Sequence, residues 1–113
     1  MISMAINPAG WVKHAAAAAT TAVASASSVA GKQHVIYSIT AALASTARGT
    51  LKLLETTSSG GSTALLETTI YNAATITFPA GVAITPSRAA KASLNTTSTG
   101  TRQVSIHGIT RGA

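Results

Sequence analysis

Residues 35–43, with the sequence VIYSITAAL, decide the fold class that we predict for this chain. Apolar and small polar side chains alternate along the run, which places Val35, Tyr37, Ile39, Ala41 and Leu43 on one face and Ser38 and Thr40 on the other. A period of two is typical of a β-strand that turns one face to a core, whereas a helix repeats every 3.6 residues. The run therefore predicts a half-buried strand.

Similar runs follow toward the C-terminus, separated by turns rich in Gly, Pro, Ser and Thr. They cover residues 50–56, 64–71, 75–78, 82–84, 89–95 and 102–110. The segment 57–62, TSSGGS, indicates a hairpin loop, across which Glu55 and Glu67 are expected to match. Pro79 is expected to end the strand before it. This spacing predicts an all-β chain folded as an antiparallel β-sandwich.

The chain before this region has a different composition and predicts an extended N-terminal arm over residues 1–28, followed by a sandwich domain over 29–113. Ala15 to Ala19 form a run of the best helix former. Five Ala residues followed by Thr, Val and Ser are too few to nucleate a stable helix, so an extended segment that pairs with a sheet edge is favoured over a helix.

The composition predicts a thin core. Ala, Thr and Ser make up 55 of the 113 residues, and only 28 residues are large and apolar. A chain of this length forms one domain and has to bury nearly all of its large apolar side chains. A solitary molecule would be sparsely packed, so association into an oligomer is expected.

The positive charge of the chain comes from a lack of acids. Eight Lys or Arg residues stand against two Glu residues, which gives a formal net charge of +6. The basic residues are spread almost evenly: Lys13, Lys32, Arg48, Lys52, Arg88, Lys91, Arg102 and Arg111. Nucleic-acid-binding modules concentrate such residues on one face, so nucleic acid is an unlikely partner, and scattered solubilising charges or an acidic protein partner fit better.

Residues suited to catalysis or metal binding are scarce. Glu55 and Glu67 are the only acids, and a solvated strand face explains both. The three His residues, at 14, 34 and 107, follow no metal-ligand spacing and are expected at the surface or at an interface. We therefore expect no enzyme activity, no metal and no cofactor. No apolar run approaches the ~18 residues of a membrane-spanning helix, so no membrane partner is expected.

Four large or charged side chains in this small-residue chain are candidates for partner contacts: Trp11, Lys13, Arg88 and Arg111. Trp11 is the only Trp, and its apolar surface has to be covered somewhere. It either folds back on its own sandwich or anchors the arm on a neighbouring subunit.

Several short segments carry a resemblance to a known family. In order, they are WVKH at 11–14 with its Ala/Thr tract, AGKQHVI at 30–36, GTLKL at 49–53, ITFPAG at 76–81 and IHGIT at 106–110. This order resembles the capsid decoration, or cement, proteins of tailed bacteriophages. The resemblance implies a jelly-roll-like β-sandwich that sits on the outer surface of the head as a homotrimer.

The leading hypothesis is therefore a structural virion protein that decorates and stabilises the head by binding the major capsid protein. Cement proteins act by burying surface across several shell subunits, which requires no chemistry. Two alternatives remain open. One is a tail-fibre or adhesion module that displays loops 58–62 and 95–100 to a host surface, and the other is a basic internal virion protein that contacts DNA.

Overall fold

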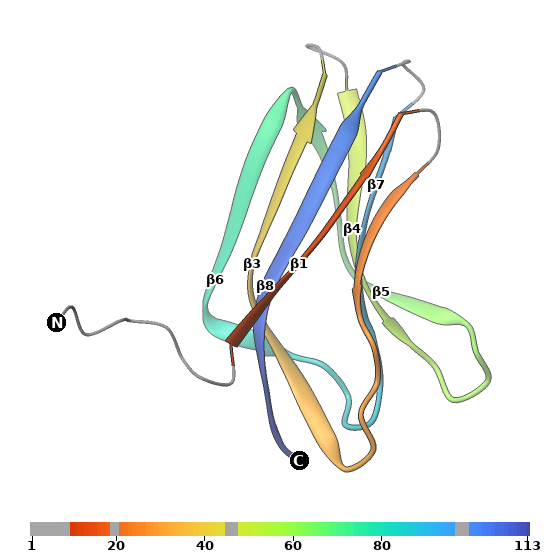
Figure 1. The fold of residues 1–113 in the computed structure, drawn as a ribbon, viewed down its shortest axis with the longest axis vertical. Coiled ribbons are helices and arrows are strands. Elements are labelled where there is room, and N and C mark those ends of the chain that lie inside the picture. Colours follow the sequence, from red (N-terminus) through yellow and green to blue (C-terminus); the bar gives the residue numbers. More distant parts are fainter. Residues whose placement is uncertain (1–9, 19–20, 45–47, 97–99) are drawn as a thin grey trace, which may run out of the picture.

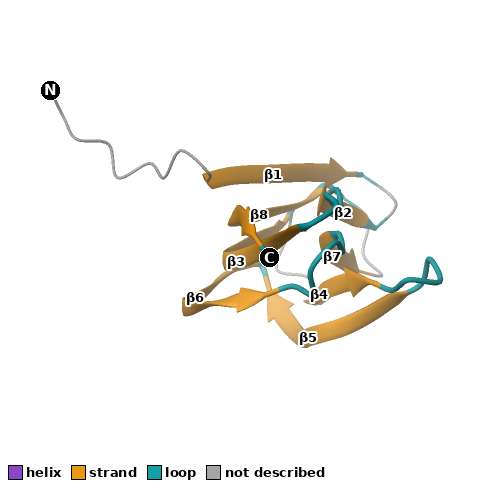
Figure 2. Cartoon of the chain, turned by 90° about the horizontal axis from the view of Figure 1, so that it is seen from below, coloured by secondary structure: helices purple, strands orange, loops and turns teal. Residues whose placement is uncertain are grey.

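The chain folds into two facing β-sheets. The structure, a computed structural model, describes residues 10–18, 21–44, 48–96 and 100–113. The strands are β1 (Gly10–Ala17), β2 (Ala22–Ala26), β3 (Lys32–Leu43), β4 (Arg48–Thr56), β5 (Ser62–Tyr71), β6 (Ala73–Ala83), β7 (Ala90–Thr96) and β8 (Arg102–Gly112). One sheet has the order β1-β8-β3-β6 and the other β2-β7-β4-β5, with every neighbouring pair antiparallel (Figures 1 and 2). The predicted all-β antiparallel sandwich is confirmed.

The strand pairing follows a simple rule. The first strand pairs with the last, β2 with β7, β3 with β6, and β4 with β5. The chain is thus one long antiparallel hairpin whose closed end is the loop between β4 and β5. Rolling this hairpin up adds the pairs β3·β8 and β4·β7, which place β8 and β7 inside their sheets. The strands nearest the two chain ends therefore lie side by side.

The core lies between the sheets and is built from the inward side of each strand. Its largest fully buried side chains are Ile36, Ile39, Leu51, Leu53, Ile84, Leu94, Val104 and Ile106. Along the edge strand β2, the buried positions are Ala22, Ala24 and Ala26, whereas Val23 and Ser25 are exposed. Small side chains at this edge leave room for the neighbouring edge strand β1.

Two irregularities separate the structure from the alternation that the sequence predicts. A register shift between Ile36 and Ser38 moves Ile36 into the core and leaves Tyr37 half-buried. The prediction that Pro79 ends its strand is wrong, because β6 continues to Ala83. An edge strand tolerates Pro where its missing N–H faces away from the ladder. Gly81 has a φ of 78°, a backbone conformation that is strained for residues with a side chain, and it allows the local kink in the strand.

The predicted match between Glu55 and Glu67 is also wrong. The ladder instead pairs Glu67 with Lys52 and Glu55 with Thr63. The Lys52 ammonium lies 3.6 Å from the Glu67 carboxylate on the outer face of the sheet. The turn closed by the Thr57–Gly61 hydrogen bond sets Glu55 opposite Thr63, and the bulge between Leu53 and Leu54 then moves Glu67 by one position onto Lys52.

The N-terminal segment is extended where the structure describes it. Residues 10–17 form the edge strand next to β8, and residues 22–26 form the edge strand next to β7. No helix occurs among the described residues of this segment, and residues 1–9 and 19–20 lie outside them. Both edge strands pair within their own chain, and the boundary of an arm at residue 28 stays a prediction.

Candidate partner surface

The four side chains predicted to contact a partner come from three elements. Trp11 and Lys13 lie on β1, Arg88 lies in the loop between β6 and β7, and Arg111 lies near the end of β8. That loop, the turn between β2 and β3, and the end of β8 lie together at one end of the sandwich, which Figure 2 shows from below. The backbone N–H of Ser87 donates to the Lys32 carbonyl (2.8 Å) and joins the loop to the start of β3.

Four basic residues gather around this end and are called the basic end below: Lys32, Arg88, Lys91 and Arg111. Lys91 is on β7 opposite Ser25, and Arg111 is opposite Gln33. Lys32 and Lys91 are not among the predicted contact residues, and they are 59 positions apart in the chain. The fold brings them to the same end, because the loop that leads to Lys91 is hydrogen-bonded through Ser87 to the Lys32 carbonyl.

Arg111 is fixed by neutral partners. Its Nε and Nη2 donate to the Gln33 side-chain oxygen (3.2 and 3.0 Å), and the Gln33 Nε2 donates to the carbonyl of Ile84 (2.9 Å). Within the described part of the chain, no cation of the basic end lies within 4.0 Å of a carboxylate. Glu55 caps the nearby loop instead, because it accepts the backbone N–H (3.1 Å) and the hydroxyl (2.6 Å) of Thr85.

Trp11 folds back on its own sandwich in this structure. Its indole Nε1 donates to the Thr110 hydroxyl (2.8 Å), and its ring meets the His34 ring edge to face at 5.6 Å. The partner of Trp11 across the ladder is Gly108, where a Cβ would lie 3.0 Å from the indole and 2.5 Å from the Val35 carbonyl oxygen. The absence of a side chain at Gly108 therefore makes room for the indole.

His34 is buried, which corrects the expectation of a surface or interface imidazole at this position. Only 4% of the residue is exposed, and both ring nitrogens are hydrogen-bonded. Nε2 lies 2.7 Å from the Ser27 carbonyl, which only accepts, so the ring hydrogen is on Nε2. Nδ1 then accepts from the Thr110 hydroxyl (2.8 Å). His14 and His107 are exposed.

A cavity of about 280 Å³ opens beside this cluster. Its lining residues are Trp11, Lys13, Ser25, Ala26, Ser27, Val29, His34 and Thr110. Val29 is 44% exposed, so apolar surface is accessible at its mouth. The cavity places Trp11 and Lys13 next to the turn between β2 and β3, which leads into Lys32. Ser25, another lining residue, lies opposite Lys91 in the β2·β7 register.

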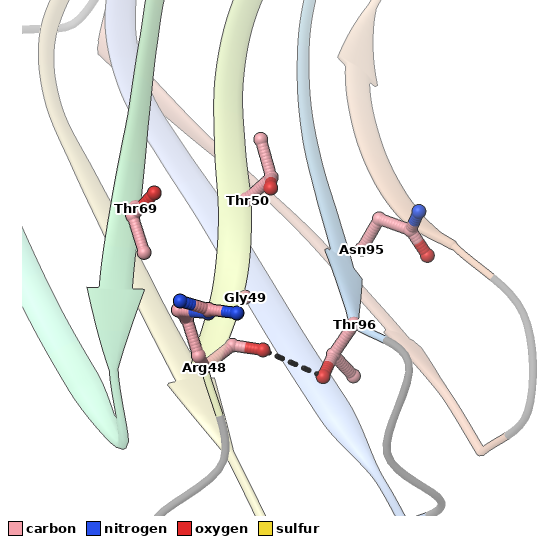
Figure 3. A pocket seen from close by; sticks show the side chains of 6 residues that line it. All are labelled: Arg48, Gly49, Thr50, Thr69, Asn95 and Thr96. Carbon is pink, nitrogen blue, oxygen red and sulfur yellow. Dashed lines mark hydrogen bonds between the residues drawn. The ribbon is translucent and has the colours of Figure 1, made fainter.

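Two further cavities lie on the outer face of the second sheet. One, of about 190 Å³, is lined by Arg48, Gly49, Thr50, Thr69, Asn95 and Thr96 (Figure 3). The other, of about 310 Å³, is lined by Thr21, Thr50, Lys52, Glu67, Ser93 and Asn95. Neither lining contains His or Cys, and the single carboxylate, that of Glu67, is paired with Lys52. Both surfaces offer hydroxyl and amide groups for hydrogen bonds.

Among the described residues, no group of three His, Asp or Glu side chains is placed to hold a metal ion. No helix there has the length and apolar character needed to cross a membrane. The expectations of no enzyme activity and no cofactor stay predictions. Comparisons with family models, curated proteins and solved structures find no match to this chain.

Proposed function

We propose that this protein decorates and stabilises the head of a tailed bacteriophage, as a homotrimer on the outer surface of the shell. The observation that carries the proposal is the strand order, with β1-β8-β3-β6 facing β2-β7-β4-β5. We propose that this rolled hairpin is a jelly roll, an architecture of eight strands in two sheets that recurs in viral capsid proteins. The sequence resemblance to cement proteins supports the same assignment.

The trimer and the shell contact are further parts of the proposal. The edge strands β1 and β2 both come from the first 28 residues and border the side of the sandwich that carries Lys13. The predicted arm, residues 1–28, includes Trp11, which lines the cavity beside the basic end. In this proposal, the arm contacts a neighbouring subunit, and the major capsid protein binds at the end of the sandwich next to the arm.

The test uses the full chain and phage heads assembled without it. The protein is added in excess to purified heads, and its position and copy number are determined by cryo-electron microscopy at side-chain resolution. Density for three copies around local symmetry axes on the outer surface is the expected result.

Other locations would overturn the proposal and favour an alternative. Protein found on the tail fibre or bound to host cells would favour an adhesion module. Protein that is protected inside intact particles would favour a DNA-contacting internal protein. In the same preparation, sedimentation velocity of the free protein gives its oligomeric state, and a purely monomeric protein that also stays monomeric on heads would rule out the trimer.

A further inference from the structure

We infer that the basic end, with the adjoining Trp11–Val29 surface, docks on an acidic protein surface through carboxylate groups. The inference rests on the proposed function only in naming the phage shell as the source of those carboxylates. It names the face of the sandwich that meets the partner and the chemistry of the contact.

Positive charge is concentrated at one end of the sandwich. The fold gathers four of the eight basic residues at one end, and Lys13 lines the cavity beside them. The acid at this end, Glu55, already accepts two hydrogen bonds from Thr85. Even with a carboxylate on Ala113, this end keeps an excess of positive charge. Such a field speeds association with an acidic partner and disfavours basic surfaces.

A second argument is the geometry of Arg111. Two of its N–H groups are held by the neutral oxygen of Gln33, so the guanidinium is oriented without being neutralised. The remaining donors of this exposed side chain have no hydrogen-bond acceptor among the described residues and can face a partner. Because guanidinium and carboxylate form charge-assisted pairs with two parallel hydrogen bonds, an oriented Arg loses less freedom when it binds an acid.

The apolar surface beside the basic residues favours a protein partner over a nucleic acid. Lys13 lines the cavity together with Trp11 and the exposed Val29, and the Lys32 N–H donates to the Val29 carbonyl (3.0 Å). Lys91 lies opposite Ser25, another lining residue. An apolar centre with a charged rim is the pattern of protein interfaces, in which Trp and Arg often dominate affinity. A phosphate backbone offers no apolar complement to Val29. The arrangement therefore favours a protein surface rich in Asp or Glu.

The experiment uses a zero-length carbodiimide, which couples lysine amines to carboxylates that touch them, with poly-L-glutamate as the probe and peptide mass spectrometry as the readout. We expect coupling of the probe to Lys32 and Lys91. Lys52 is the internal control, because it lies against Glu67 and should couple mainly within the chain. Equal coupling of the probe to all four lysines would overturn the inference.

A pair of double variants measures the contribution of the arginines. Arg88→Gln with Arg111→Gln removes two charges from the basic end, and Arg48→Gln with Lys52→Gln removes two charges elsewhere. We expect the first pair to weaken poly-L-glutamate binding about tenfold relative to the second. An equal effect of both pairs would show that only net charge matters and would overturn the inference. Thermal melting checks that both variants fold.

A duplex DNA of random sequence is the competing probe. DNA binding that is stronger than poly-L-glutamate binding at the same salt, and that is lost in the first double variant, would reassign this surface to nucleic acid and overturn the inference. The proposed function is tested separately with heads. Head binding that survives the first double variant would leave that function standing and refute the docking face. If the protein does not bind heads but binds poly-L-glutamate selectively through the basic end, the proposed function is refuted and the docking face stands.

Discussion

Gly108 is the residue on which the packing of Trp11 depends. The indole lies over it, and a Cβ would approach the Val35 carbonyl oxygen to 2.5 Å, a backbone atom that has little freedom to move. We expect Gly108→Ala to lower the free energy of unfolding by about 1–3 kcal/mol, the usual cost of overpacking. Urea unfolding followed by the fluorescence of the single Trp measures the effect.

The matched control for Gly108 lies four residues along the same strand. A Cβ at Gly112 would meet nothing within 4 Å, so Gly112→Ala should change the stability by less than about 0.5 kcal/mol. Equal stability of the two variants would contradict the proposed role of Gly108.

His34 joins β1, β3, β8 and the turn after β2 through one buried imidazole. Replacing it with Phe keeps a ring against Trp11 but leaves the Ser27 carbonyl without its donor and the Thr110 O–H without its acceptor, although the Thr110 oxygen still accepts from Trp11. We expect His34→Phe to cost about 1–3 kcal/mol for each group left unsatisfied. His107→Phe on the outer face is the control and should have little effect. Chemical denaturation of both variants, with the Trp11 emission maximum as a local probe, distinguishes them.

Sequence reasoning identified the residue types but misplaced two of the polar ones. His34 is expected at the surface or at an interface, and Arg102 is counted among scattered solubilising charges or contacts to an acidic partner, yet they are 4% and 2% exposed. The Arg102 guanidinium donates to the carbonyls of Thr96 (3.4 Å), Ala18 (3.4 Å) and Gly100 (3.1 Å). A buried polar side chain is stable only with such partners. A partner that is distant in the chain, such as the Ala18 carbonyl for Arg102, is not visible in a local sequence pattern.

At the scale of elements, alternation and turn residues were sufficient to predict strands but not their register. The runs at 35–43, 50–56 and 64–71 all lie within observed strands. The shifts at Ile36/Ser38 and Leu53/Leu54 changed which side chains face inward or pair across strands. A bulge depends on how two strands fit together, so one strand's sequence does not determine it.

The edge strand β2 offers an element-scale prediction. Its inward residue Ala24 is 1% exposed, packs within the core and is not part of the cavity lining that includes Ala26, so a larger side chain would be overpacked at this position. We expect Ala24→Leu to destabilise the sandwich by about 1–3 kcal/mol and to shift the emission of Trp11 on the adjacent strand. Val23→Leu, one position along and facing outward, should be close to neutral. Thermal and urea unfolding of both variants provide the measurement, and an equal loss in the two would contradict the observed alternation.

At the scale of the whole molecule, the rolled hairpin explains why evenly spaced basic residues form a basic end. Rolling up the hairpin pairs β3 with β8, and this places Lys32, opposite Gly112, next to Arg111, opposite Gln33. The even spacing of the basic residues along the chain does not by itself indicate a patch. The three-dimensional grouping follows from topology, which composition does not encode.

The rolled hairpin also predicts where the chain can be cut. Because Gly10 pairs with Ile109, the start of β1 lies beside the end of β8, and residues 1–9 are long enough to join Ala113 to Gly10 at roughly 3.3 Å per residue. A circular permutant that links Ala113 to Met1 and opens between Ser59 and Gly60 moves the free ends into the exposed loop between β4 and β5. We expect it to fold with a Trp11 emission spectrum like that of the parent, because every strand pair is kept.

The matched control for the permutant opens the chain between Ser105 and Ile106, in the middle of β8. That strand lies between β1 and β3, so the cut divides the central ladder of its sheet and should abolish folding. Circular dichroism and sedimentation velocity on both proteins test the prediction. A loop permutant that folds only as an oligomer would mean that β1 and β8 pair between chains in solution. The edge strands would then have to be assigned to neighbouring subunits.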